Sequence, residues 1–165
     1  MTIYTIGHSH TTIERFIDLL QLHPIQLLVD TRSQPYSRYA PQFNRESLKT
    51  SLQQVGIAYL YLGDELGGRP RDAQYQLPNG KIDYEQLART SFYREGLARL
   101  KHEAEARCVA IMCSEADYRK CHRYWLITRS LVNEAVEVHH ILHSGDLIQT
   151  RPDEFSPAPR QLGLF

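Results

Sequence analysis

The stretch "IQLLVD" (residues 25–30) decides the fold class, because it is nearly all apolar and ends on a single carboxylate. A continuous apolar run of this length is typical of a strand that is covered on both faces. Strands of this kind belong to parallel sheets with helices on both sides. The stretch therefore predicts an α/β protein.

The segments around this stretch alternate between the patterns of strands and helices. Four further strands are expected at residues 2–7, 57–62, 108–113 and 136–142. Helices are expected at residues 11–22, with a capping box of Thr11 and Glu14, at 44–55, at 83–106 with a break near Ser91, and at 117–133. We expect one three-layer α/β/α domain over residues 1–145, with a mainly parallel five-stranded sheet in the Rossmann-like order 3-2-1-4-5. A Pro-rich tail of residues 146–165 follows it.

The composition is that of an ordinary globular protein. Hydrophobic residues make up 42% of the chain and the formal net charge is zero, so overall charge does not indicate a nucleic-acid or membrane binder. Three cysteines are too few for a disulfide scaffold, which fits a reducing compartment. The sequence begins without a signal-peptide pattern and has no apolar run long enough for a membrane span. We expect a soluble, cytoplasmic protein without membrane contact.

Polar residues gather where the expected strands end. In an open parallel sheet, ligands bind beyond the carboxyl ends of the strands at the point where strand order reverses, here between the first and fourth strands. A long loop from residue 63 to residue 82 adds two glycines that let backbone approach a ligand, and Arg69 and Arg71 beside them could bind anions; the alternative is a flexible surface loop. The residues concerned are Gly7, His8 and Ser9; Asp30, Arg32, Ser33 and Arg38; Gly67 and Gly68; and Cys113, Glu115, His122 and Arg123.

Cys113 stands where a strand is expected to turn into a helix N-terminus. Exposed amides at such a turn favour anions and lower the pKa of a thiol. With Arg119, Cys113 has the C-x5-R spacing of a phosphatase loop. Against that interpretation, Glu115 inside the loop would repel a phosphate, and the loop lacks glycines that let amides converge on an anion.

Other interpretations of the same segment remain open. Cys113, Cys121, His122 and His8 could hold zinc, but their spacing matches no common structural pattern. Cys121 could instead pack in the core on an apolar helix stripe, as free cysteines usually do. His122 and Arg123 could lie on a solvated helix face.

Two residues at the strand ends have both a structural and a functional interpretation. An isolated carboxylate at Asp30 would be expensive to bury, so it is expected to pair with Arg32. That pair could merely organise its loop, or it could form a charged pocket wall, and both can hold together. His8 ends the first strand and titrates near neutrality, which makes it a catalytic candidate.

The strand-end motifs "TIGHS", "VDTRSQPYSRYAPQFN", "LGG" and "CSE…CHR" together resemble the domain-of-unknown-function family 488 over residues 2–145. The resemblance implies a small three-layer α/β protein of prokaryotes and no settled reaction. It also implies that the strand-end residues, including Pro35 and Cys121, belong to the family's motifs.

The segment "QLGLF" (161–165) resembles the pentapeptide with which bacterial replication and repair proteins bind the sliding clamp. Gln161, Leu162, Leu164 and Phe165 match that pattern, and Gly163 departs from it. The Pro-rich residues before it are suited to a spacer. The resemblance implies the clamp as a partner; the alternative is that these apolar residues dock on the protein itself or on a second copy.

Together these features predict a protein of DNA metabolism or repair that binds a phosphate-bearing nucleotide or nucleic acid in the strand-end crevice, with hydrolysis as a candidate reaction. The candidate catalytic groups are His8, Asp30, Glu115 and His122. The candidate ligand contacts are Ser9, Arg32, Ser33, Arg38, Gly67, Gly68, Cys113 and Arg123. One alternative is a non-catalytic binding module recruited through the tail, and another is a thiol or metal enzyme that uses Cys113. The sequence identifies no cofactor.

Overall fold

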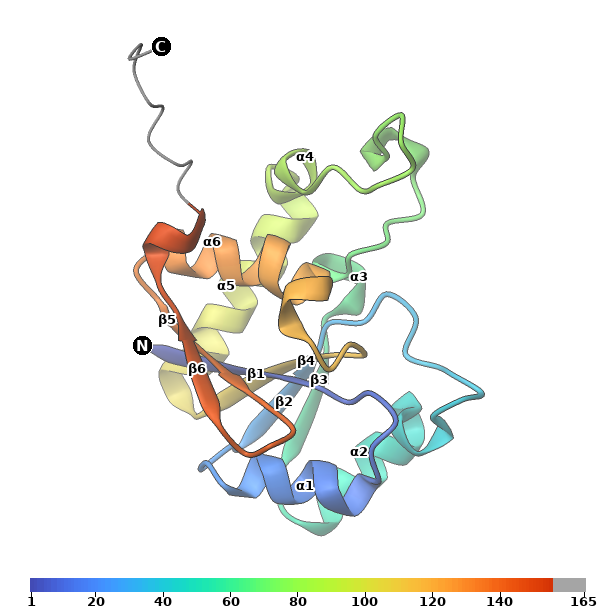
Figure 1. Cartoon of the computed structure of the whole chain (residues 1–165), viewed down its shortest axis with the longest axis vertical. Coiled ribbons are helices and arrows are strands. Elements are labelled where there is room, and N and C mark those ends of the chain that lie inside the picture. Colours follow the sequence, from blue (N-terminus) through green and yellow to red (C-terminus); the bar gives the residue numbers. More distant parts are fainter. Residues whose placement is uncertain (156–165) are drawn as a thin grey trace, which may run out of the picture.

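A computed structural model of the chain describes residues 1–155, and the predicted α/β class is confirmed (Figure 1). The strands are β1 (Thr2–Gly7), β2 (Leu27–Asp30), β3 (Ala58–Tyr61), β4 (Val109–Cys113), β5 (Glu137–Ile141) and β6 (Leu147–Thr150). The helices are α1 (Ile13–Gln21), α2 (Arg45–Gln54), α3 (Gly63–Leu66), α4 (Tyr84–Ala88), α5 (Ser91–Ala106) and α6 (Arg129–Asn133). A π-helical segment, η4 (Arg123–Thr128), runs directly into α6.

The helices cover the two faces of the sheet in two groups. In Figure 1, α1 and α2 lie below the sheet, and α5 and α6 pack on the opposite face. Phe16 of α1 and Leu48 of α2 pack in the hydrophobic core on one face of the sheet. Leu100 of α5 and Leu131 of α6 pack in the core on the other face. Because crossovers between parallel strands are right-handed, the helices change face when the chain reverses its direction across the sheet. That reversal creates the switch point where a ligand site is expected.

The strand order differs from the prediction. The sheet runs β3-β2-β4-β1-β5-β6, so β4 lies between β2 and β1 instead of beyond β1. Ala110 of β4 is in register with Leu28 on one side and Tyr4 on the other, and every residue of β4 is buried. The most apolar strand thus occupies the middle of the sheet. An apolar pattern indicates that a strand is buried, but it does not say which strands are its neighbours.

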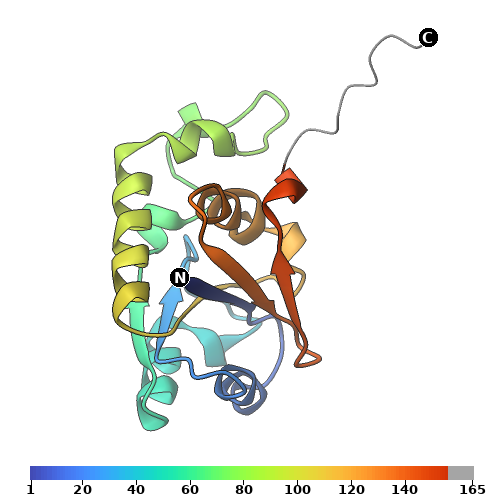
Figure 2. The same cartoon turned by 90° about the vertical axis from the view of Figure 1, so that its left-hand side faces the viewer.

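The sheet has six strands instead of the predicted five. The additional strand, β6, pairs antiparallel with β5 and forms one edge of the sheet (Figure 2). Three of its four residues are exposed and only Thr150 is buried. A short edge strand with little buried surface leaves a weak signal in the sequence, and the pattern therefore missed it.

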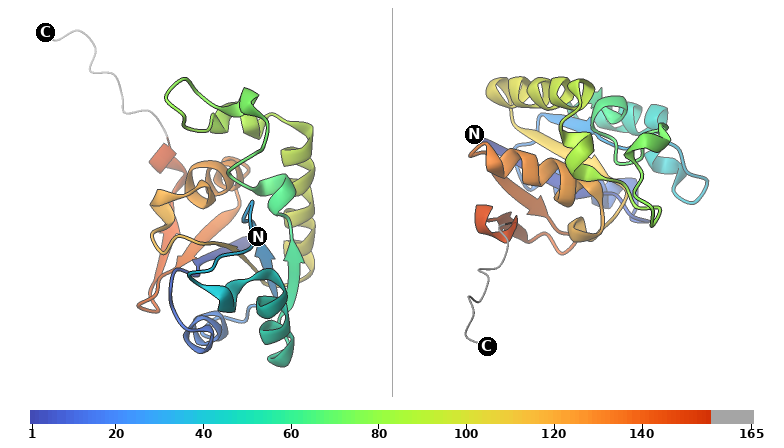
Figure 3. Two further views of the ribbon diagram at one scale, coloured as in Figure 1. Left: turned by 90° about the vertical axis from the view of Figure 1, so that its right-hand side faces the viewer. Right: turned by 90° about the horizontal axis from the view of Figure 1, so that it is seen from above.

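The helical predictions need three corrections. Thr12, not Thr11, caps α1, accepting a hydrogen bond from the Arg15 amide. The long loop after β3 contains the short helix α3, which packs against α5 (Figure 3). The helix predicted over 117–133 is broken: Cys121 has an extended backbone between a short 3-10 turn, η3 (Tyr118–Lys120), and η4. The predicted break near Ser91 is confirmed, because α5 begins there.

Within residues 1–155, we find no helix that combines the length and the apolar character needed to cross a bilayer.

Candidate functional site

A pocket of about 500 Å³ opens beyond the carboxyl ends of β1, β2 and β4, at the switch point of the sheet. Its volume is in the range of small-molecule sites, about 300–1,000 Å³. Residues from three strand-end loops, the α3–α4 loop and the start of α4 line it. The lining consists of His8, Ser9, His10, Arg32, Ser33, Gln34, Tyr36, Ser37, Tyr39, Ala40, Gly68, Arg69, Tyr84, Cys113, Ser114, Glu115, Lys120, Cys121 and His122.

The loops after β1 and β4 are held side by side by backbone contacts. The His8 amide donates to the Cys113 carbonyl at 3.0 Å, and the Ser9 amide donates to the Ser114 carbonyl at 2.8 Å. A Cβ atom on Gly7 would overlap the backbone carbonyl of Glu115. Glycine at this position therefore allows the close approach that forms the pocket floor.

A buried ion pair at the carboxyl end of β2 supports one wall of the pocket. The guanidinium of Arg32 donates to both carboxylate oxygens of Asp30, at 2.9 and 2.8 Å, and the Tyr59 hydroxyl donates to the same carboxylate at 2.6 Å. Arg32 also donates to the carbonyl of Phe43. Asp30 is fully buried and does not line the pocket, whereas Arg32 does. In this arrangement Asp30 orients the guanidinium that borders the pocket.

His8 completes this wall as a neutral imidazole. Its Nδ1 lies 2.8 Å from the Ser9 carbonyl, which can only accept, so Nδ1 carries the proton. Nε2 is then the acceptor that faces Arg32 Nη1 at 3.3 Å. Burial, more than any other factor, lowers the pKa of His8 to about 4. At neutral pH His8 thus supplies a hydrogen-bond acceptor and no charge.

His122 also lines the pocket and contacts the backbone directly before Arg32. Its Nε2 faces the Thr31 carbonyl at 3.0 Å and therefore donates, which leaves Nδ1 as the acceptor. Burial of the ring lowers the pKa of His122 to about 4. Gly68 packs so closely on this ring that a Cβ there would overlap it. The next residue, Arg69, is held by its backbone amide, which donates to the Ser33 hydroxyl at 3.0 Å.

Two thiols meet at the pocket floor. The Sγ atoms of Cys113 and Cys121 are 2.9 Å apart, and both residues line the pocket. The expected lowering of the pKa of Cys113 is wrong, because burial and its hydrogen bond to Cys121 raise it. The hydrogen bond from Cys113, followed by the charge of Arg123, instead lowers the pKa of Cys121.

Arg123 supports the floor from behind. It is 1% exposed and does not line the pocket. Its guanidinium donates to the Thr5 hydroxyl and to the Glu115 carbonyl, both at 2.9 Å. It therefore anchors the loop that carries Glu115, and it does not lie on a solvated helix face.

The structure brings most of the predicted site residues into one pocket. Those that line it are His8, Ser9, Arg32, Ser33, Gly68, Cys113, Glu115 and His122. Five others lie outside the lining: Gly7, Asp30, Arg38, Gly67 and Arg123. Arg38 is exposed, and Gly67 is buried beside Ser33.

Arg69 and Arg71 follow the two glycines and were candidate anion contacts, and Arg69 lines the pocket whereas Arg71 does not. Several other lining residues were not predicted. Tyr36 and Tyr39 lie in the loop after β2, and both are largely exposed. Lys120 and Tyr84 carry no local signal, because only the tertiary structure brings them to the pocket.

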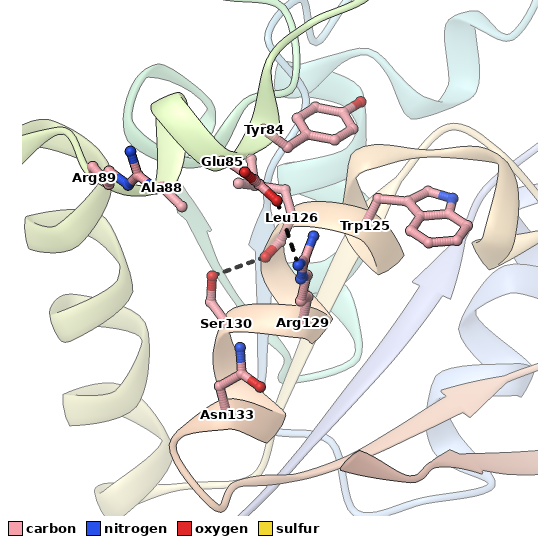
Figure 4. A pocket seen from close by; sticks show the side chains of 9 residues that line it. All are labelled: Tyr84, Glu85, Ala88, Arg89, Trp125, Leu126, Arg129, Ser130 and Asn133. Atoms are coloured by element: carbon pink, nitrogen blue, oxygen red, sulfur yellow. Dashed lines mark hydrogen bonds and ion pairs between the residues drawn. The ribbon is translucent and has the colours of Figure 1, made fainter. Parts of the chain in front are cut away.

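A second pocket of about 330 Å³ lies between α4 and the η4–α6 segment (Figure 4). Figure 4 shows Glu85 and Arg129 facing each other across it, with an ion-pair distance of 3.7 Å. Tyr84 lines this pocket as well as the strand-end pocket. The strand-end pocket remains the better candidate site, because the motif residues of three loops converge there.

The residues proposed for a zinc site do not gather as one. In residues 1–155, no three His, Cys, Asp or Glu side chains come together in positions that could hold a metal ion.

The fold and the pocket define a doubly wound three-layer α/β protein with a charged crevice at its switch point. The model of the family described as "Domain of unknown function DUF488" matches residues 12–129. The chain belongs to this family, as its strand-end motifs indicated. No curated protein and no solved structure matches the chain. The clamp-like segment of residues 161–165 lies outside the described residues.

Proposed function

We propose that the strand-end pocket binds a phosphate-bearing ligand, either a nucleotide or part of a nucleic acid. The observation that carries this proposal is the charge of the lining. The lining contains three cationic side chains, those of Arg32, Arg69 and Lys120, and a single carboxylate, that of Glu115. Asp30 neutralises Arg32, so two cations remain against one anion, and an anionic ligand would balance the site.

Aromatic side chains favour a nucleotide over bare phosphate. Tyr36 and Tyr39 are 54% and 78% exposed and line the pocket, and Tyr84 lines it as well. Exposed tyrosine rings offer flat surfaces on which a base can stack. The combination of cations and tyrosines therefore suits a ligand with both a phosphate and a base.

Binding of nucleotides can be measured by calorimetric titration. We expect Arg69→Ala and Lys120→Ala each to weaken binding about tenfold, the loss of about 1.4 kcal/mol that one charge-assisted contact supplies. Arg71→Ala is the matched control, because Arg71 is exposed and lies outside the lining. Equal losses for Arg71→Ala and Arg69→Ala, or no binding by the wild type, would refute the proposal.

The catalytic version of the proposal is hydrolysis. Glu115 is the only carboxylate of the lining and the candidate base for activating water, and His122 offers its Nδ1 as an acceptor. Glu115→Gln should abolish turnover of a bound nucleotide or DNA substrate while binding is retained. Binding without turnover by the wild type would favour the alternative, a non-catalytic module.

A place in DNA metabolism rests on the sequence "QLGLF" at residues 161–165. We propose that this segment binds the sliding clamp. Tethering to a clamp on DNA would raise the local concentration of the protein at DNA, so the protein would need no basic surface of its own. Deleting residues 161–165 should remove clamp binding in a pull-down with purified proteins. Gly163→Ser, which restores the clamp pattern, should strengthen it, and Arg160→Ala should leave it unchanged. Equal clamp binding before and after the deletion would refute this role.

A further inference from the structure

Cys113 and Cys121 form a close thiol pair that the proposed binding function does not use. Cys113 ends β4, and Cys121 reaches it because its backbone is extended (φ −143°, ψ 172°) between the 3-10 turn and η4. Their Sγ atoms are 2.9 Å apart. A disulfide requires about 2.05 Å, so the two sulfurs need to approach by only about 0.9 Å.

The charge behind this pair indicates that one of the thiols is ionised. Arg123 is almost fully buried, its Nε has no hydrogen-bond partner, and no carboxylate within residues 1–155 forms an ion pair with it. A buried cation is normally compensated by an anion. The charge of Arg123 acts on the thiols of Cys113 and Cys121, so either thiol can supply that anion by losing its proton.

The two cysteines are not equivalent in access. Cys113 is 2% exposed, whereas Cys121 is partly exposed in the pocket. The hydrogen bond from Cys113 and the nearby Arg123 lower the pKa of Cys121, which supports the same assignment. Cys121 is therefore the thiolate that a small oxidant reaches first, and Cys113 is the thiol placed to react next.

We propose that Cys113 and Cys121 are a peroxide-reactive dithiol that closes reversibly to a disulfide. The Cys121 thiolate attacks one oxygen of hydrogen peroxide, the O–O bond breaks, and hydroxide leaves and takes a proton to become water. Cys121 is then a sulfenic acid. The sulfur of Cys113 attacks that of Cys121, the S–S bond forms, the S–O bond breaks, and a second water leaves with the remaining proton. Two thiols and one peroxide thus give one disulfide and two waters.

Mass spectrometry of the full chain tests this proposal. One equivalent of hydrogen peroxide should lower the mass by about 2 Da and yield a linked Cys113–Cys121 peptide, both reversed by dithiothreitol. Cys108 lies at the opposite end of β4 and provides the internal control, so it should stay open to alkylation. A mass unchanged by peroxide, or disulfides that involve Cys108 as often as Cys113, would overturn the proposal.

Serine variants separate the two roles. Cys113→Ser should accumulate a sulfenic acid at Cys121 that dimedone traps, and Cys121→Ser should slow oxidation of Cys113 at least about tenfold. Cys108→Ser should oxidise as the wild type does. Equal oxidation rates in Cys121→Ser and wild type would contradict the assignment of Cys121. If either variant fails to fold by circular dichroism, the linked peptide from the wild type still decides the proposal.

Discussion

Replacing Asp30 by asparagine tests whether the ion pair behind the pocket stabilises the fold by charge. The carboxylate is fully buried and accepts four hydrogen bonds, from the Arg32 amide, Nε and Nη2 and from the Tyr59 hydroxyl. Asparagine has nearly the same shape, so it leaves no cavity. It removes the charge, however, and leaves the guanidinium of Arg32 buried without a counterion. We expect a loss of about 3–5 kcal/mol in the free energy of unfolding.

The assay is urea denaturation followed by circular dichroism. A loss of about 3–5 kcal/mol is a large part of the stability of a domain, about 5–15 kcal/mol. Asp18→Asn is the matched control, because Asp18 is exposed on α1, and it should change stability by less than about 0.5 kcal/mol.

A double-mutant cycle then isolates the pair. Arg32→Met should also destabilise strongly, because it leaves the Asp30 carboxylate buried alone. The double variant Asp30→Asn with Arg32→Met carries neither charge, so its cost should be clearly below the sum of the two single costs. Additive single costs, or a loss below about 1 kcal/mol for Asp30→Asn, would refute the electrostatic argument.

Three further predictions concern the strand ends and the sheet. Gly7→Ala should lower the free energy of unfolding by at least about 2 kcal/mol in denaturation experiments, because the added Cβ of the alanine would overlap the backbone of Glu115. An unchanged free energy of unfolding would contradict the close approach of the two loops. Tyr59→Phe should lower the free energy of unfolding by about 1.5–3 kcal/mol in the same assay, because it removes a hydrogen bond to a buried carboxylate. A loss no larger than that of the same substitution at an exposed tyrosine would count against this prediction. Burial lowers the pKa values of His8 and His140 to about 4 and about 3, so the unfolded chain binds more protons as pH falls below about 6.5. The contribution of each histidine to the free energy of unfolding should be complete above about pH 6.5 and should fall by about 1.4 kcal/mol per pH unit as the pH drops towards 4. A urea concentration at the midpoint of unfolding that stays constant from about pH 7 to about pH 5 would exclude this.

Local patterns were sufficient for the elements with strong signals. The apolar run at β2 indicated a covered strand, and all four residues of β2 are buried. The break before α5 was also predictable, because Thr90 provides a side-chain cap for the new helix. Signals of this kind depend on neighbours within a few residues, and the sequence displays them directly.

Strand neighbours and the interruption at Cys121 depend on contacts distant in the sequence. The position of β4 between β2 and β1 follows from packing across the whole sheet, which no local pattern records. The expected helix over 117–133 failed for a related reason. An extended residue at Cys121 brings its thiol to Cys113, and tertiary packing overrides the helical periodicity there.

The sequence by itself determined the α/β class and placed a polar cluster at the strand ends, because burial and turns leave local patterns in residue type. Only the tertiary structure decided the role that each polar side chain has in the pocket. It pairs the buried Asp30 with Arg32, places Arg123 outside the pocket lining and brings the two thiols together. These are contacts between segments that the folding of the sheet brings side by side, and their geometry comes from packing and hydrogen bonding across the sheet.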